Sequence, residues 1–153
     1  MPSPWCKLSC MRTIALCLVL AASLAAAHKP AQKKVIQPKD FPTGRPFSPG
    51  ILVDGTLYIA GQTGTDVKTG KLPEEFEAEV KQALENVGAV LKEAGMGFEN
   101  AVAVQVYLTD MDLFQRMNAV YTTYFKDPRP ARTTVGVARL AGPAHIEITV
   151  TAR

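Results

Sequence analysis

Two segments of the chain repeat apolar residues at three- and four-residue spacing, the pattern of an amphipathic helix packed on a core. The first helix is predicted from Glu74 to about Ala94, with Gly95 placed to end it. The second is predicted from Asp112, a candidate N-cap with Gln115 in capping-box spacing, to about Phe125. The apolar stripe of the first helix consists of Phe76, Val80, Leu84, Val87 and Leu91.

The remaining regular segments have the pattern of strands. Apolar and small or polar residues alternate strictly over residues 100–109. Ile51–Val53 and Leu57–Ala60 flank Asp54-Gly55-Thr56, and Asp-Gly is a strong signal for a tight hairpin turn. The glycine-rich stretch 61–70 is expected to be a loop, and two last strands are predicted at 131–140 and 146–152.

These elements follow the order ββαβαββ, with an extra strand expected near residues 34–37. Two helices packed on one face of such a sheet make an α+β fold. The valines of residues 102–106, together with Val135 and Val137, are predicted to face the helices. The opposite face would then carry Arg132 and Glu147 among small and polar residues. Because a solvated face normally carries more lysine and glutamate, we expect another subunit to cover it.

The N-terminus has the organisation of a secretory signal. Lys7 and Arg12 precede an uncharged apolar run, residues 14–27, that is too short for a spanning helix and ends in three alanines. The mature protein is therefore expected to be periplasmic or secreted, with no stable membrane insertion after cleavage. Translation starts at Met1 or at Met11, and the pattern leaves both starts open.

The signal divides the chain into three expected parts. Residues 1–27 form the signal peptide, 28–45 a basic tail and lead-in, and 46–153 one domain. Removing the leader takes two of the 17 basic residues and none of the 14 acidic ones, so the mature charge is close to neutral. A nucleic-acid partner is not indicated by this balance.

Elimination narrows the possible chemistry. All three cysteines lie in the leader, and the mature chain has Ser48 as its only serine, with His28 and His145 as its only histidines. These residues are too few for a zinc site, and nothing resembling a nucleophile elbow surrounds the serine. The glycines after Ala60 do not form a dinucleotide-binding loop. What remains is Arg132 on one strand and Glu147 on the next, either as a structural ion pair or as a site.

The segment 130–140 has the sequence PARTTVGVARL and is followed after a short gap by Ile146-Glu147-Ile148. Together they closely resemble the C-terminal signature of the RidA/YjgF family of reactive-intermediate imine deaminases, which is also described as endoribonuclease L-PSP-like. Residues 59–62 resemble its SGQ stretch, 84–87 its first helix and 118–121 its second. The resemblance covers nearly the whole mature chain.

The resemblance implies a chorismate-mutase-like fold in a homotrimer, with sites in clefts between subunits. It implies that Arg132 binds a substrate carboxylate, that Glu147 positions the attacking water, and that Gly61 and Asn118 line the cleft. The implied reaction is hydrolysis of small 2-imino or enamino acids to 2-oxo acids and ammonia, without a metal or cofactor. The implied partners are therefore a small imino or oxo acid and further copies of the chain.

Three positions depart from the archetypal family pattern. Phe47, Ala60 and Thr134 stand where such members commonly carry tyrosine, serine and cysteine, and the loop 126–129 is shorter. Fewer polar groups in the cleft could change the substrate, weaken catalysis or leave only binding. The alternative to an enzyme is thus a non-catalytic binding module for small carboxylates in the periplasm. A ribonuclease activity is disfavoured by the near-neutral charge and the lack of a histidine pair. The physiological substrate stays open, because imines from dehydratases arise in the cytosol.

Overall fold

The computed structural model describes residues 31–153, so the expected signal peptide lies outside the described residues. The main helices are α2 (Phe76–Glu93) and α3 (Phe114–Tyr124), and 3-10 turns η1 (Phe98–Asn100) and η2 (Met111–Leu113) precede β4 and α3. The strands are β1 (Lys34–Ile36), β2 (Gly50–Val53), β3 (Thr56–Thr63), β4 (Ala101–Leu108), β5 (Ala131–Gly136) and β6 (Ile146–Ala152). Within this range no helix is both long and apolar enough to cross a membrane.

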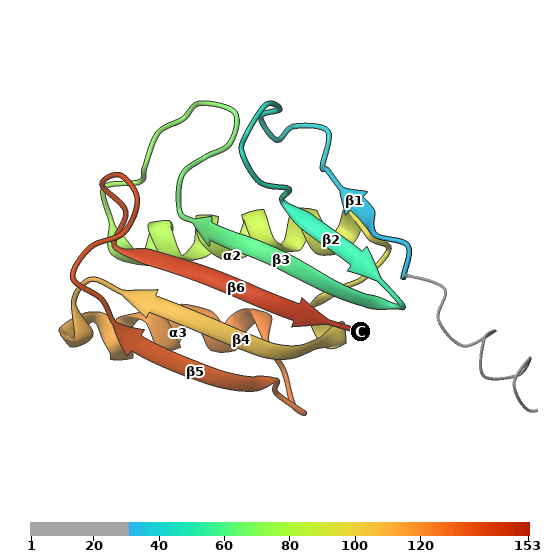
Figure 1. Ribbon diagram of the computed structural model, residues 1–153. Helices are drawn as coiled ribbons and strands as arrows, with labels where there is room; N and C mark the ends of the chain where they lie inside the picture. Colours follow the sequence, from blue (N-terminus) through green and yellow to red (C-terminus); the bar gives the residue numbers. More distant parts are fainter. Residues whose placement is uncertain (1–30) are drawn as a thin grey trace, which may run out of the picture. The chain divides into compact units, whose positions relative to one another are not determined.

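The strands form one mixed sheet in the order β1-β2-β3-β6-β4-β5, with both helices on the same face (Figure 1). Only β4 and β5 run parallel, and the other neighbouring strands are antiparallel. The predicted ββαβαββ order is confirmed, including the extra strand near residue 34. Because β4 lies between β5 and β6, the two last strands of the chain are not neighbours.

The predicted hairpin turn between β2 and β3 is confirmed. Asp54 and Gly55 both have positive φ values, 49° and 75°, as a two-residue turn of this kind requires. The expected loop from Gly61 is wrong at its start, because β3 continues to Thr63 after a bulge between Ile59 and Gln62. The bulge re-aims the strand, as such insertions do.

The core lies between α2, α3 and the sheet. The apolar stripe of α2 is buried as predicted, and Val80, Leu84, Val87 and Leu91 have no exposed surface. Gly95, with φ of 75°, ends the helix, since its N–H reaches back to the carbonyl of Lys92. Burying one such side chain stabilises the fold by roughly 1.5–3 kcal/mol.

The start of α3 differs from the prediction by a few residues. Asp110, not Asp112, is the capping aspartate, and its carboxylate accepts a hydrogen bond from the N–H of Asp112 at 2.8 Å. This cap starts the turn η2, and α3 follows from Phe114 without a side-chain cap of its own. Asp110 and Asp112 are equally suitable N-cap residues by sequence pattern, and only the course of the backbone determines which of them is the cap.

The predicted facing of two strand segments is wrong. Val102 is 50% exposed, because a register shift between Ala101 and Ala103 interrupts the alternation on β4. On β5, Arg132 pairs with the buried Val104 and Thr134 with the buried Val106, so both face the helices. A one-residue difference in strand phase moves every side chain to the other face.

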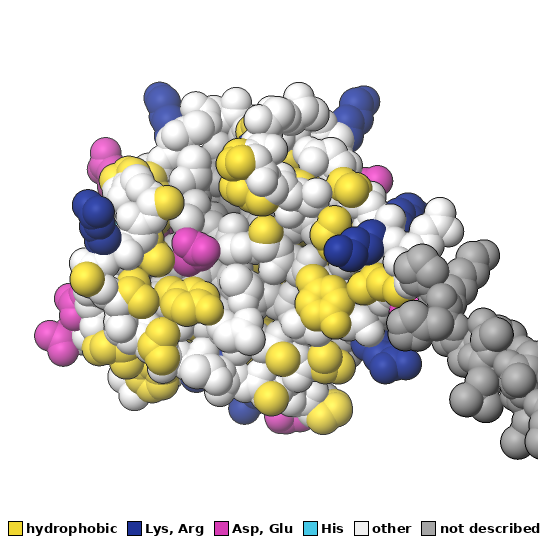
Figure 2. Space-filling view, viewed as in Figure 1, with side chains coloured by type: hydrophobic (Ala, Val, Ile, Leu, Met, Phe, Trp, Pro, Cys, Tyr) yellow, Lys and Arg dark blue, Asp and Glu magenta, His cyan; other side chains and the backbone are white. Residues whose placement is uncertain are grey.

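The face of the sheet away from the helices carries more apolar surface than predicted. Tyr58 pairs with Thr151 and is 53% exposed, so this face carries Tyr58 as well as Tyr107. Val35 and Val135 are 55% and 41% exposed on the same face by register. Figure 2 views this face, where apolar and uncharged side chains dominate and most charged ones lie toward the rim. We call it the open face.

Candidate active site

Arg132 lies against the aromatic side chains of α3. Its guanidinium carbon is 4.4 Å from the centre of the Tyr121 ring and 5.7 Å from that of Phe114. Tyr121 stacks in turn on Phe125, with ring centres 4.4 Å apart. Stacking on a ring face holds the planar fork while leaving its edge N–H groups free to bind a carboxylate. No carboxylate of residues 31–153 forms an ion pair with Arg132.

A hollow of about 330 Å³ opens beside Arg132. It is lined by Asn118, Tyr121, Thr122, Arg129, Pro130 and Arg132, a set we call the arginine half-site. The Tyr121 hydroxyl and the hydroxyl of Thr134, two residues after Arg132 on β5, are buried without a hydrogen-bond partner among residues 31–153. Burial raises the pKa of Tyr121, although Arg132 and Arg129 act in the opposite direction. The Tyr121 hydroxyl therefore stays protonated at neutral pH.

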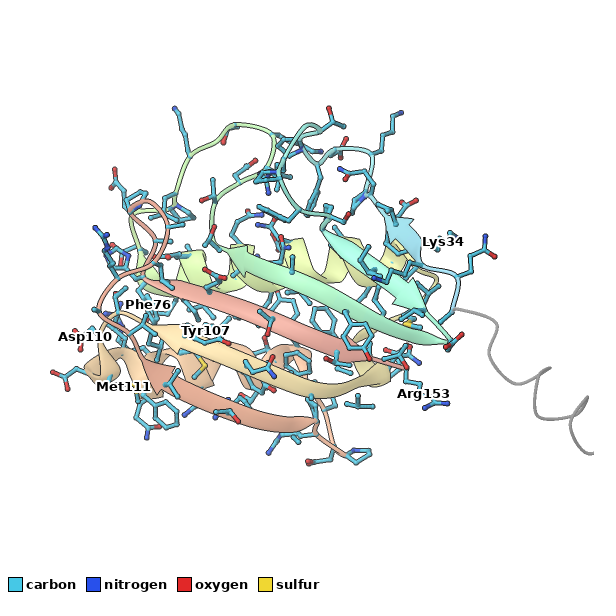
Figure 3. All side chains as sticks on the ribbon, viewed as in Figure 1. Lys34, Phe76, Tyr107, Asp110, Met111 and Arg153 are labelled. Atoms are coloured by element: carbon cyan, nitrogen blue, oxygen red, sulfur yellow. The ribbon has the colours of Figure 1, made fainter. Side chains whose placement is uncertain are left out.

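Glu147 belongs to a different surface. It pairs with Thr63 of β3 and with Tyr107 of β4, which Figure 3 labels, and so it projects from the open face. A Cβ at residue 61 would overlap the Glu147 carboxylate, so glycine is required there for the carboxylate to keep its place. We call Gly61, Thr63 and Glu147 the glutamate half-site. A hollow of about 110 Å³ extends from Gly61 and Thr63 toward Arg45 and Asn86.

Phe47 and Ala60 lie on the side of the glutamate half-site. Ala60, beside Gly61 on β3, donates its N–H to the carbonyl of Pro49 at 3.0 Å. This bond ties the Phe47 loop to β3. Phe47 is 49% exposed, with the Arg45 guanidinium 5.7 Å from its ring centre. An aromatic ring left this exposed on a loop is available to a ligand or a second chain.

Within one chain the two half-sites do not form a single cleft. Arg132 of β5 pairs with Val104 of β4, whereas Glu147 of β6 pairs with Tyr107 of β4. Arg132 and Glu147 are thus two strand spacings and three residues apart, which separates their backbones by roughly 14 Å. They also project from opposite faces of the sheet, so the predicted pairing on one face is wrong. The structure thus groups the predicted site residues in two sets: Asn118, Arg132 and Thr134, and Phe47, Ala60, Gly61 and Glu147.

The sequence pattern missed a buried charged contact behind the glutamate half-site. Glu79 of α2, only 1% exposed, accepts hydrogen bonds from the backbone N–H groups of His145 at 2.7 Å and Ile146 at 3.2 Å. Its other oxygen lies 2.8 Å from Nδ1 of the His145 ring. Glu79 thereby anchors the start of β6, immediately before Glu147. Its helical spacing predicts a residue facing the core, but not its partner 66 positions away.

The side chains of the two half-sites have different chemical properties. Among residues 31–153 no group of three or more histidine, cysteine, aspartate or glutamate side chains could hold a metal ion. The arginine half-site offers the guanidinium N–H groups of Arg129 and Arg132, which suit a carboxylate ligand. The glutamate half-site offers a carboxylate that can orient or deprotonate water.

Comparison with known proteins identifies the family to which this chain belongs. The model described as endoribonuclease L-PSP matches residues 38–153. The chain belongs to this family, RidA/YjgF. A RutC family protein from Aquifex aeolicus is 46% identical over 109 residues, covering 70% of this chain and 87% of that protein. A Mus musculus protein named 2-iminobutanoate/2-iminopropanoate deaminase is 42% identical over 118 residues, covering 76% and 87%.

Solved RidA structures share the fold. RidA from an Antarctic Psychrobacter bacterium superposes with a TM-score of 0.74 at 34% identity, covering 78% of this chain and 98% of that one. The predicted RidA/YjgF membership and the predicted α+β fold, with two helices on one sheet face, are therefore confirmed. Relatives of 42–45% identity carry the imine deaminase name, which supports imine deamination as the general activity.

Proposed function

We propose that the protein hydrolyses small 2-imino and enamino acids to 2-oxo acids and ammonia. The observation that carries this proposal is Arg132, a guanidinium stacked on Tyr121 beside a hollow and without an acidic partner in the described range. A planar, oriented and unneutralised guanidinium is suited to a carboxylate, the group that every 2-imino acid carries. The naming of relatives as imine deaminases supports the same reaction.

The proposed reaction needs only water and the two half-sites. Arg132 holds the substrate carboxylate, and Glu147 takes a proton from a water as its oxygen adds to the imine carbon. That proton is returned to nitrogen to give a carbinolamine. The hydroxyl proton of the carbinolamine then passes to the nitrogen, by way of Glu147, as the C–N bond breaks, so that a C=O bond forms and ammonia leaves. The protein supplies orientation and proton transfer, and no electron acceptor is involved.

The geometry of a single chain requires a second copy for this reaction. Arg132 and Glu147 project from opposite faces, so one small substrate reaches both only if they come from different chains. The open face, with Tyr58, Val35 and Val135 exposed, is the surface we propose to be buried in this assembly. A closed homotrimer brings each arginine half-site to a neighbour's glutamate half-site.

We also propose that the protein acts outside the cytosol, after removal of residues 1–27. The support is the basic, apolar and small-residue order of the N-terminal sequence. N-terminal sequencing of the protein from a periplasmic or culture fraction should begin near His28. A chain beginning at Met1 or Met11 in the cytosolic fraction alone contradicts export.

The direct test of activity uses imines made in the assay. The mature protein should accelerate the release of ammonia from freshly generated 2-iminobutanoate and 2-iminopropanoate above the buffer rate. The enhanced rate of ammonia release should saturate as the imine concentration rises, and it should disappear when 2-oxobutanoate competes for the site. An unchanged rate with both imines contradicts the proposed enzyme.

One feature favours a binding module as the second candidate. Phe47 and Ala60 bring no hydroxyl to the glutamate half-site, and the hydroxyl of Thr134 is buried. Saturable calorimetric binding of 2-oxobutanoate without imine turnover would support this module over the enzyme. Arg132 would bind the carboxylate in either case.

A further inference from the structure

Within one chain, the arginine half-site contains two guanidinium groups. Arg129 and Arg132 both line its hollow, with Asn118 and Thr122 as further polar groups, and none of the described residues lining it is acidic. Two guanidinium groups beside one hollow create a positive potential that favours a ligand with more than one negative charge.

Arg129 has only a weak partner within the described range. Its Nε lies 3.7 Å from the Asp127 carboxylate, and the two side chains are 51% and 82% exposed. An exposed pair at this distance contributes little to stability and rearranges readily. Arg129 lies three residues before Arg132 in the chain. It can therefore turn toward a ligand that Arg132 already holds.

The hollow has room for a ligand that reaches both arginines. Its volume of about 330 Å³ falls at the lower end of the range typical of small-molecule sites. Tyr121 also lines the hollow, and its ring face holds the Arg132 guanidinium. A substrate with only a short apolar side chain leaves Arg129 unused.

We infer that the preferred substrates are four- and five-carbon 2-imino acids with a second carboxylate on the side chain, which Arg129 binds while Arg132 binds the first. This inference rests on the proposed function and names its substrate class. The reaction is the same addition of water and loss of ammonia. 2-Iminosuccinate plus water gives oxaloacetate and ammonia, and 2-iminoglutarate gives 2-oxoglutarate and ammonia.

The test compares substrates in one protein. The wild type should show a kcat/KM for 2-iminoglutarate, made in the assay by an amino-acid oxidase, about tenfold above that for 2-iminobutanoate, the factor expected for one charged contact. Arg129→Gln should lower this ratio to about one, since its amide keeps polarity without charge. Arg139→Gln, outside the hollow, is the matched control and should keep the ratio. An equal ratio in the wild type and Arg129→Gln overturns the inference.

A binding measurement separates this inference from the proposed function. The stable products 2-oxoglutarate and 2-oxobutanoate are titrated calorimetrically into wild type and Arg129→Gln. Tighter binding of 2-oxoglutarate that depends on Arg129 supports the inference even if no imine is turned over. Turnover of imines with no preference for the dicarboxylate in either assay overturns the inference and leaves the proposed function standing.

Discussion

Replacing Arg132 with alanine should lower kcat/KM for 2-iminobutanoate by about 10²- to 10⁴-fold. A carboxylate held by two charge-assisted hydrogen bonds loses roughly 1.5–3 kcal/mol for each bond removed, and each 1.4 kcal/mol is a factor of about ten. The loss should appear mainly as a higher KM if the contact is equal in the bound substrate and the transition state. Steady-state kinetics of ammonia release measures both constants.

Two further variants separate the shape of the guanidinium from its charge. Arg132→Lys keeps the charge but loses the planar fork and its stacking on Tyr121, so it should recover only a small part of the lost activity. Arg116→Ala removes an arginine that pairs with Glu77 at 2.6 Å, outside both half-sites, and should retain the wild-type rate. Full activity of Arg132→Ala would show that the carboxylate is held elsewhere.

Replacing Glu79 with alanine should destabilise the folded protein by about 3 kcal/mol. The buried carboxylate accepts hydrogen bonds from the N–H groups of His145 and Ile146, and truncation removes this acceptor from both. Because Ile146 precedes Glu147, the loss should also reduce activity in protein that remains folded. Urea unfolding at one fixed protein concentration measures the effect, since association contributes to stability.

A neighbouring glutamate provides the matched control for Glu79. Glu77 lies two residues before Glu79 on α2 and pairs with Arg116 at the surface. Glu77→Ala should therefore change the unfolding midpoint only slightly. Glu79→Gln keeps one acceptor oxygen and should fall between the wild type and Glu79→Ala. Equal midpoints for Glu77→Ala and Glu79→Ala would show that the anchor at β6 contributes nothing.

The periodic parts of the fold could be predicted because burial is reinforced over many residues. The stripe from Val80 to Leu91 repeats over several turns, and Asp54-Gly55 has the positive φ values that few other residue pairs adopt without strain. The end of β3 could not be predicted from Gly61, since its glycine serves the close approach of Glu147 instead of a loop. Only the paired strand reveals that contact.

The candidate site was harder to predict because it depends on strand phase. Residues 132–135 contain an arginine and three β-branched side chains, so either alternation gives a plausible strand. Arg132 faces the helices, where it stacks on the ring of Tyr121. This contact joins distant segments of the chain, so no local sequence pattern predicts it. For the same reason the sequence did not predict a role for Arg129, which lines the same hollow as Arg132. Residues 1–27 as a signal peptide stay a prediction.

The central claim is that Arg132 of one chain and Glu147 of another serve the same substrate. Arg132→Ala and Glu147→Gln chains, each inactive alone, are unfolded together in equal amounts and refolded, and native mass spectrometry verifies that mixed oligomers form. Random assembly into a closed ring should restore about a quarter of the wild-type sites, each joining an intact arginine to an intact glutamate. Mixed oligomers with no more imine hydrolysis than the two parents would contradict a site shared between chains.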